Sequence, residues 1–251
     1  MTAPLLAVKG LTKRYGSLLV TDDVHLEIAA GEAHALIGPN GAGKTTFIHQ
    51  LAGTLQSNSG SILLEGEDIT HLPMDVRVRK GLARSFQITS ILPGYTVLEN
   101  VALAVQARAG SSFRFFRAVA TEAALNNEAM AALARVGLDH RAGVRAGLLS
   151  HGEKRLLEIA IAIATKPKLL LHDEPRAGLG KEESRAAIQL LARLKSELTM
   201  ILVEHDMDAV FALAARVSVL VYGRIIATGT PDEIKANAQV RAAYLGTEEG
   251  V

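Results

Sequence analysis

The segment with the clearest capacity for chemistry is a glycine-rich loop that fits the pattern G-x-x-x-x-G-K-[ST]. With the threonine that follows the pattern, its residues are Gly38, Pro39, Asn40, Gly41, Ala42, Gly43, Lys44, Thr45 and Thr46. Glycines allow the backbone to curl so that successive N–H groups converge on phosphate oxygens, and a helix start adds a favourable dipole. Lys44 would reach the β- and γ-phosphates, and Thr45 offers a hydroxyl to Mg²⁺, which prefers hard oxygen ligands. The loop predicts a nucleoside triphosphate site; the alternative is a glycine-rich turn without a ligand.

Two adjacent carboxylates, Asp173 and Glu174, follow the apolar run 169–171. Because side chains alternate along a strand, the two carboxylates are expected to point in different directions at the carboxyl end of a sheet. Asp173 would hold Mg²⁺ through its shell, whereas Glu174 would polarise the attacking water as a general base. His172, one place earlier, is expected to pack on the sheet. The acidic pair predicts hydrolysis of the nucleotide; the alternative is that both residues cap a strand-to-loop turn.

Both motifs need strand ends that lie beside a helix start. Short apolar runs predict strands at 34–37, 61–64, 169–171, 200–203 and 217–221. Helical patterns separate most of these runs, and the first, 44–52, begins at the glycine-rich loop and is closed by Gly53. Alternating strands and helices predict an α/β layered fold with a mostly parallel sheet.

The segment 89–164 has a different pattern, because it contains helical candidates and almost no strand signal. The helices are expected at 97–107, 121–136 and 152–164. Ser150 and Glu153 form a Ser-x-x-Glu capping box at the start of the last of them, and Thr230 with Glu233 repeats the pattern near the C-terminus. We interpret the segment as a helical insertion into the α/β core.

Composition excludes several classes of function. Lys and Arg number 27 against 26 Asp and Glu, and this balance argues against a protein that binds nucleic acid by neutralising many phosphates. Mean hydropathy is +0.21, yet no run approaches the roughly 18 apolar residues that a membrane span needs. The chain has no Cys, which excludes disulfides, a thiolate nucleophile and Cys-ligated zinc. Its start, MTAPLLAVKG, lacks the features of a secretory signal, so a reducing cytoplasm is expected.

Further residues, in order around the two motifs, resemble the motifs of the ATP-binding cassette ATPases. The stretch Leu149-Ser-His-Gly-Glu153 is similar to their signature motif LSGGQ, although His151 replaces a glycine and Glu153 a glutamine. Three single residues resemble the adenine-stacking aromatic residue, the Q-loop glutamine and the switch histidine of the family, namely Tyr15, Gln87 and His205. Taken singly, each has an ordinary structural explanation. Their order across nearly the whole chain is what carries the resemblance.

The resemblance implies one cassette domain, with ATP and Mg²⁺ as cofactors. Segments 1–88 and 165–251 would form the RecA-like and β core, which includes an N-terminal antiparallel β portion, and 89–164 would form the helical subdomain. Two cassettes, identical or paralogous, would face each other head to tail. The resemblance assigns catalysis to Lys44, Gln87, Glu174 and His205. It assigns Mg²⁺ to Thr45, Gln87 and Asp173, adenine to Tyr15, and contacts with the partner's ATP to Ser150, Gly152 and Glu153.

Longer stretches resemble the ATPase subunits of bacterial branched-chain amino acid importers, including VEHDMDAVFALAARV and YGRIIATGTPDEIKANAQVRAAYLG. This implies two transmembrane permease subunits as partners, a periplasmic solute-binding protein that acts indirectly, and no nucleic acid. It also implies a peripheral location on the cytoplasmic face of the bacterial inner membrane. The alternative is an importer of urea or short-chain amides in the same family. A cassette of DNA repair or translation is disfavoured, because the chain shows neither a long coiled-coil insertion nor a second cassette.

Other features concern partners and coupling. The segment 92–100 resembles the surface that receives coupling helices of membrane subunits. Phe113, Phe115 and Phe116 would form the small core of the helical insertion or would touch a membrane subunit or lipid headgroups. Gly180 stands where the family usually has the aspartate of its D-loop, so it cannot supply a carboxylate for coupling between the two sites. Arg176, where threonine is frequent, is expected in a surface salt bridge.

Overall fold

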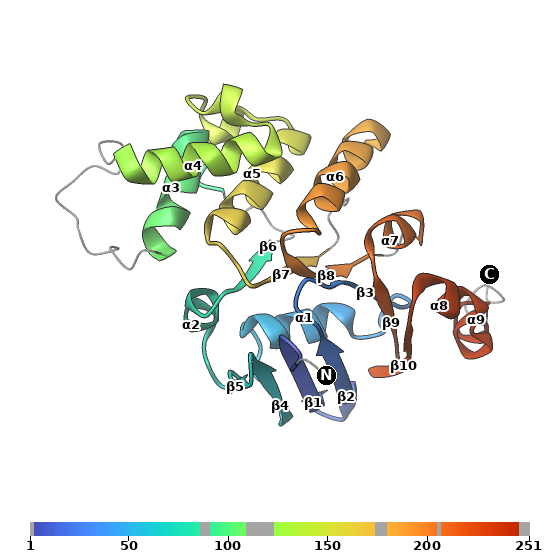
Figure 1. Ribbon diagram of the computed structural model, residues 1–251. Helices are drawn as coiled ribbons and strands as arrows, with labels where there is room; N and C mark the ends of the chain where they lie inside the picture. The colour runs from blue at the N-terminus through green and yellow to red at the C-terminus, as the bar shows by residue number, and fades with distance from the viewer. Residues whose placement is uncertain (1–2, 86–90, 109–122, 174–179, 205–206, 246–251) are drawn as a thin grey trace.

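The computed structural model describes residues 3–85, 91–108, 123–173, 180–204 and 207–245, and its centre is a six-stranded sheet (Figure 1). The strand order is β10-β9-β3-β8-β7-β6. The bounds are β3 Ala33–Ile37, β6 Leu82–Ser85, β7 Leu169–Asp173, β8 Thr199–Val203, β9 Arg216–Val221 and β10 Arg224–Gly229. All neighbouring pairs are parallel except β9 and β10. The predicted α/β fold with a mostly parallel sheet is confirmed.

A second, four-stranded sheet is antiparallel and has the order β2-β1-β4-β5. Its strands are β1 Leu6–Tyr15, β2 Leu18–Ile28, β4 Ser59–Leu64 and β5 Glu67–Asp68. The predicted run 61–64 is a strand of this sheet and not of the parallel one. The apolar pattern did not identify β1 and β2, because irregular pairing interrupts their alternation, with register shifts on both sides of Leu11.

The first helix, α1 (Lys44–Ala52), lies between the two sheets (Figure 1). One buried apolar cluster joins Leu6 of β1, Phe47 of α1 and Leu171 of β7. Leu170, the neighbour of Leu171, belongs instead to a cluster on the opposite side of the central sheet. This alternation along β7 explains why the run reads as continuously apolar, since both faces of the strand are covered.

Three helices cover that opposite side: α3 (Val97–Arg108), α4 (Ala123–Val136) and α5 (His151–Ala164). They match the predicted helices to within a residue or two at each end, with residues 121 and 122 outside the described part of the chain. Their core is one cluster with the sheet, because Leu133 of α4 and Leu157 of α5 belong to the same group as Leu170. The helical segment therefore packs directly on the core.

The remaining helices flank the central sheet or follow its last strand. They are α2 Met74–Arg79, α6 Lys181–Leu194, α7 Met207–Leu213, α8 Pro231–Ala236 and α9 Ala238–Leu245. Short 3₁₀ turns span Asp139–Arg141 and Ala146–Leu148. Both predicted capping boxes are present, with Ser150 and Glu153 at α5 and Thr230 and Glu233 at α8.

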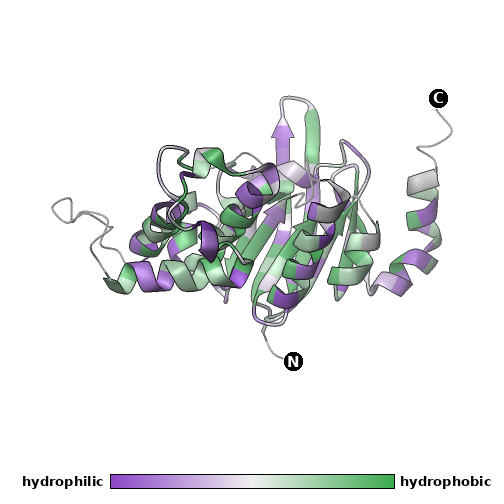
Figure 2. Ribbon diagram, turned by 90° about the horizontal axis from the view of Figure 1, so that it is seen from above, coloured by the Kyte–Doolittle hydropathy of each residue, from purple (hydrophilic) through white to green (hydrophobic). Residues whose placement is uncertain are grey.

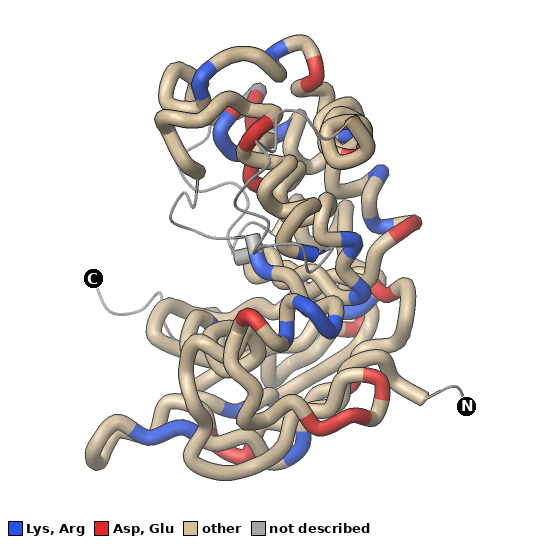
Figure 3. Tube along the Cα trace, turned by 90° about the vertical axis from the view of Figure 1, so that its left-hand side faces the viewer, with Lys and Arg blue, Asp and Glu red and all other residues tan. Residues whose placement is uncertain are grey.

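Hydropathy and charge follow this arrangement. The central strands are largely hydrophobic and most helices show hydrophobic and hydrophilic residues in alternation (Figure 2). On the face shown in Figure 3, basic and acidic segments are interspersed. Ion pairs link residues of opposite charge, such as Lys80 and Glu67 at 2.6 Å. Within the described residues, no helix combines the length and apolarity that crossing a membrane requires.

Candidate nucleotide-binding site

The glycine-rich loop connects the fully buried strand β3 to helix α1, as the sequence predicts. Gly43 at its end has φ +103°, and a Cβ there would lie 2.4 Å from the carbonyl oxygen of Val20 in β2. A side chain is therefore excluded at this position, since β2 approaches the loop too closely. The sequence identified the loop and missed the part of β2 beside it, because that contact joins residues far apart in the chain.

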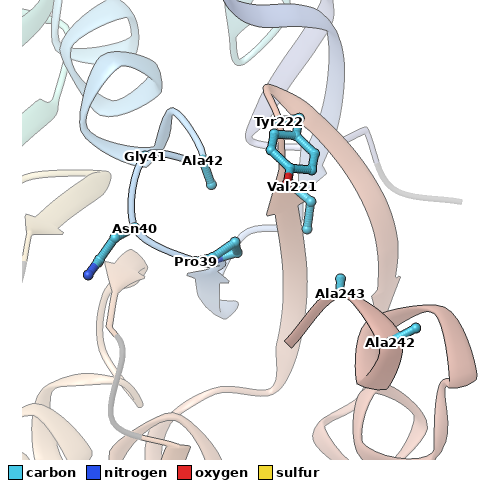
Figure 4. Close-up of a pocket in the computed structure, with 8 residues that line it drawn as sticks. All are labelled: Pro39, Asn40, Gly41, Ala42, Val221, Tyr222, Ala242 and Ala243. Carbon is cyan, nitrogen blue, oxygen red and sulfur yellow. The ribbon is translucent and has the colours of Figure 1, made fainter. Parts of the chain in front are cut away.

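The other side of the loop is fixed by the turn between β9 and β10. The Gly223 N–H donates to the Ala42 carbonyl at 2.9 Å, and the Asp22 N–H donates to the Gly223 carbonyl at 2.9 Å. Tyr222, at the tip of this turn, lies across a pocket from Pro39, and Ala242 and Ala243 of α9 line the same pocket (Figure 4). The loop is thus held between β2 and the C-terminal part of the chain.

A hollow of about 240 Å³ lies over the loop itself. Its lining residues are Val20, Asn40, Gly41, Ala42, Gly43, Lys44, Thr45 and Thr46. Among the residues that the structure describes, no side chain caps the start of α1, and the first turn of the helix contains no acidic residue. A helix N-terminus whose first turn carries no acidic residue suits an anion, so the hollow fits phosphate groups.

Lys44 is folded back over the loop. Its Nζ donates to the carbonyl oxygens of Gly38 at 2.6 Å and Pro39 at 3.0 Å. The ammonium group therefore stands at the hollow, where a phosphate oxygen could replace a carbonyl oxygen as its acceptor. Thr45, on the first turn of α1, is exposed at the same place.

The end of β7 lies at the same edge of the sheet as the loop. Asp173 is paired with Val203 of β8, and Val203 is paired with Leu36 of β3. At about 4.8 Å between neighbouring strands, the backbone of Asp173 is roughly 10 Å from that of β3. The end of β7 therefore lies at the edge of the sheet where the loop lies, as the acidic motif requires. Gln87, Glu174 and His205 lie outside the described residues.

His172 is fully buried, in agreement with the prediction that it packs on the sheet. Burial, together with the charge of Arg155, lowers its pKa to about 3, so the imidazole is neutral near pH 7. Arg155 forms a buried ion pair with Glu158 at 2.7 Å on α5. Burial raises the pKa of Glu158 despite this partner.

Tyr15 ends β1 with half of its surface exposed. The Nζ of Lys13 lies 5.4 Å from the centre of its ring. The chain turns there into β2, the strand that contacts the loop at Val20. The structure therefore places an accessible aromatic ring on the hairpin beside the loop, where a planar base could stack.

The signature segment lies at the start of α5. The Glu153 N–H donates to Ser150 Oγ at 3.2 Å, and the Ser150 N–H donates to Glu153 Oε2 at 2.8 Å. The Ser150 backbone N–H and the nearby Arg141 hold the pKa of Glu153 below its usual value, against a smaller contribution from burial. Ser150, Gly152 and Glu153 do not line the hollow over the loop, so the structure does not bring them to the site of their own chain.

Of Gly180, Arg176 and the phenylalanine cluster, only Gly180 lies within the residues that the structure describes. Gly180 is the N-cap residue before α6, and its N–H donates to Glu183 Oε2 at 3.1 Å. Arg176 and the cluster of Phe113, Phe115 and Phe116 lie outside the described residues.

The buried strand, the glycine-rich loop and the uncapped helix define an α/β protein that binds nucleoside phosphates. The family model described as ABC transporter matches residues 21–177, and the one described as branched-chain amino acid ATP-binding cassette transporter matches residues 224–250. The chain belongs to the ABC transporter family, and it is an ATPase.

Relatives match almost the full length of the chain. It is 38% identical to the high-affinity branched-chain amino acid transport ATP-binding protein BraF of Pseudomonas aeruginosa, over 98% of this chain and 99% of BraF. The corresponding protein LivG of Escherichia coli K12 gives the same three values. The ADP conformation of MJ1267, an ATP-binding cassette of an ABC transporter, superposes with a TM-score of 0.85 at 28% identity, over 98% of this chain and 100% of MJ1267.

Proposed function

We propose that the chain is the ATP-hydrolysing subunit of a bacterial ABC importer for branched-chain and other hydrophobic amino acids. The observation that carries this proposal is the match of residues 224–250 to the branched-chain amino acid cassette model. That segment comprises β10, α8 and α9, and Ala242 and Ala243 of α9 line a pocket with Pro39 and Ala42 of the loop. The family-specific segment thus lies against the proposed nucleotide site.

In the proposed site, the hollow over the loop holds the phosphates of ATP. The first-turn N–H groups of α1 bind phosphate oxygens, and Lys44 neutralises the β- and γ-phosphates. Tyr15 stacks on adenine. Glu174 accepts a proton from the attacking water, and His205 contacts the γ-phosphate. Glu174 follows β7 by one residue and His205 follows β8 by two residues in the sequence, and both strands end at the edge where the loop lies.

Mg²⁺ fits the oxygen donors of this site. Thr45 offers an exposed hydroxyl at the hollow, and Asp173 and Gln87 would complete the protein's share of the ligands. Magnesium sites of this type use few protein ligands, with phosphate oxygens and waters supplying the others. When bound, the ion would neutralise charge on the phosphate oxygens.

Two copies of the fold, or this chain and a paralogue, would share the sites head to tail. Ser150, Gly152 and Glu153 are exposed or half-buried at the start of α5 and are not part of the hollow of their own chain. A helix N-terminus of this kind would bind the phosphates of ATP on the partner. ATP would then hold the two cassettes together until hydrolysis removes the attraction.

A docking surface for the membrane subunits is proposed at the segment 92–95 and Leu148. Leu92, Tyr95 and Leu148 are exposed by 44%, 49% and 74% of their surface. The backbone holds them together, because the Ala146 N–H donates to the Tyr95 carbonyl at 2.9 Å and the Gly147 N–H to the Pro93 carbonyl at 3.0 Å. Ser150 follows Leu148 by two residues, so the docking surface is joined directly to the signature. We propose that two permease subunits dock here on the cytoplasmic side of the inner membrane, and that a periplasmic binding protein delivers the solute to them.

Transport by the complex tests the proposed solute. The chain, copurified with its membrane subunits and reconstituted in proteoliposomes with the binding protein, is expected to drive ATP-dependent uptake of leucine. Uptake of urea in place of leucine would favour the alternative substrate. ATP hydrolysis that no solute stimulates, and that drives no uptake, would contradict the importer proposal.

Replacing Tyr15 by serine is expected to raise the dissociation constant of ATP about 2- to 10-fold, because an aromatic stacking contact contributes about 0.5–1.5 kcal/mol. Tyr15→Phe should stay close to wild type, since the ring is retained. Equilibrium binding of ATP to the purified chain measures the effect. Leu18→Ser, which removes another exposed apolar side chain from the same hairpin, is the control. Equal losses in both serine variants would contradict stacking by Tyr15.

Leu148→Ser is expected to weaken association with the membrane subunits roughly 10- to 100-fold, because burying a leucine contributes about 1.5–3 kcal/mol. The side chain is exposed in the isolated chain, so its thermal midpoint and basal ATPase rate should not change. Copurification with the permeases and leucine uptake are the measurements. The same Leu18→Ser variant serves as control, and unchanged copurification of Leu148→Ser would exclude this surface.

A further inference from the structure

A fully buried arginine lies at the carboxyl end of helix α1. Arg77 of α2 is 1% exposed, and its guanidinium makes four hydrogen bonds, all to main-chain carbonyl oxygens. Nη1 donates to Gln50 at 2.7 Å and Leu51 at 2.6 Å, Nε to Leu72 at 2.8 Å, and Nη2 to Thr70 at 2.7 Å. Burial lowers the pKa of Arg77 to about 10, which leaves the side chain charged near pH 7.

Two of these acceptors belong to the last turn of α1, the helix whose first turn forms the phosphate hollow. The last carbonyls of a helix have no donor within the helix, and they form the negative end of its dipole. Arg77 supplies both the donors and a compensating positive charge. Gly53, directly after α1, makes room for it: with φ +77°, a Cβ at Gly53 would lie 2.7 Å from Arg77 Nε.

Other side chains fix the same end of α1. Thr21 Oγ1 of β2 donates to Gln50 Oε1 at 3.0 Å, and Gln50 Nε2 donates to Ser57 Oγ at 2.8 Å. Arg84 of β6 lies 3.2 Å from the imidazole Nε2 of His49. β2 also contacts the loop at Val20, next to Thr21, so one part of this strand contacts both the loop and the Gln50 side chain.

The short length of α1 makes a charge at one end effective at the other. Its nine residues span about 14 Å at about 1.5 Å per residue. At an effective dielectric constant of about 20, a unit charge at that distance changes the affinity for an anion by roughly tenfold. Asp68, which lies close enough to raise the pKa of Arg77, reduces this effect.

We propose that Arg77 is a positioning residue for nucleotide binding: it fixes the carboxyl end of α1, so that Lys44 and the first-turn N–H groups are held toward the phosphates. The inference rests on the proposed assignment of the glycine-rich loop as the phosphate site. Arg77 does not touch the nucleotide, and it acts through the helix. Its removal therefore affects nucleotide affinity more than turnover at saturating ATP.

Full-length Arg77→Met, which removes the charge and the donors, and Arg77→Lys, which keeps the charge, test the proposal. Arg77→Met is expected to raise the KM for ATP and the Kd of ADP about 3- to 10-fold, with kcat within about twofold of wild type. Arg77→Lys should recover most of the affinity. The control is Arg79→Met, which removes an exposed arginine of the same helix that pairs with Asp75, and it should match wild type.

Thermal midpoints measured with and without ADP separate positioning from a general loss of stability. A lower midpoint with unchanged ADP affinity overturns the proposal, as does an affinity loss in Arg77→Met that is matched by Arg79→Met. If Arg77→Met does not fold, Arg77→Lys and Gly53→Ala decide, because an added methyl group displaces the guanidinium. Lys44→Ala isolates the underlying assignment. Unchanged nucleotide affinity in Lys44→Ala would overturn the assignment of the phosphate site. If Lys44→Ala loses affinity while the Arg77 and Gly53 variants bind nucleotide like wild type, the phosphate site stands and the role of Arg77 is overturned.

Discussion

Glu174→Gln is expected to lower the rate of ATP hydrolysis about 100- to 10,000-fold, because the amide cannot accept the proton of the attacking water. Affinity for ATP should remain, since the phosphates are bound by the loop and not by this carboxylate. The bound ATP should then hold two cassettes in a closed dimer. Release of phosphate at saturating ATP measures the first effect, and sedimentation or size-exclusion chromatography with ATP measures the second.

Glu65→Gln provides the matched control, because it makes the same chemical change at an exposed residue that pairs with Lys168. Its hydrolysis rate should equal that of wild type. A Glu174→Gln variant that turns over ATP at the wild-type rate would show that another group activates the water. If the variant hydrolyses ATP slowly but forms no ATP-dependent dimer, the assignment of Glu174 as general base stands, and the proposal of a site shared by two cassettes is contradicted.

Lys44→Ala is expected to weaken ATP binding by roughly 10- to 150-fold, the loss expected for a charge-assisted hydrogen bond of about 1.5–3 kcal/mol. The structure supports this, because the Lys44 ammonium stands over the hollow on two loop carbonyls. Binding of ATP and ADP by calorimetry measures the effect.

Lys168→Ala, at an exposed lysine that pairs with Glu65, is the comparison for Lys44→Ala. The loss in Lys44→Ala should be larger for ATP than for ADP, because Lys44 is placed to reach the γ-phosphate. Equal losses of affinity for ATP and ADP would show that Lys44 contacts only the phosphates that both nucleotides carry, and not the γ-phosphate. No loss for either would refute the site.

Local features of the sequence predicted the loop and its scaffold well. A buried strand, a turn with glycines and a helix start follow each other within 20 residues, so β3, the loop and α1 are determined by neighbouring residues. The capping box at Ser150 is equally local, because its two side chains are three residues apart. Such patterns can be recognised in a sequence because both partners of each contact lie within a few residues of each other in the chain.

Contacts between distant segments could not be predicted in this way. Nothing in the apolar pattern indicates that Gly223 bonds to Ala42, or that Arg77 is buried at the end of α1. An arginine in a helix that is rich in charged residues indicates an exposed side chain, and its four carbonyl acceptors come from two other segments, the end of α1 and the connection before α2. The strands β1 and β2 were missed for a related reason, since their pairing partners, and not their own alternation, define them.

The backbone pairing of residues 93–97 with 144–147 makes the proposed docking surface and the signature one mechanical piece. Sliding one segment past the other would break several main-chain hydrogen bonds at once, so the pair resists shear. Ser150 lies only two residues after Leu148, so a displacement of Leu148 is expected to move Ser150 as well. If a membrane subunit docks at this surface as proposed, the stiffness of the short link sets how much of its movement reaches the signature. Glycines inserted between Leu148 and Ser150 are then expected to reduce that transmission.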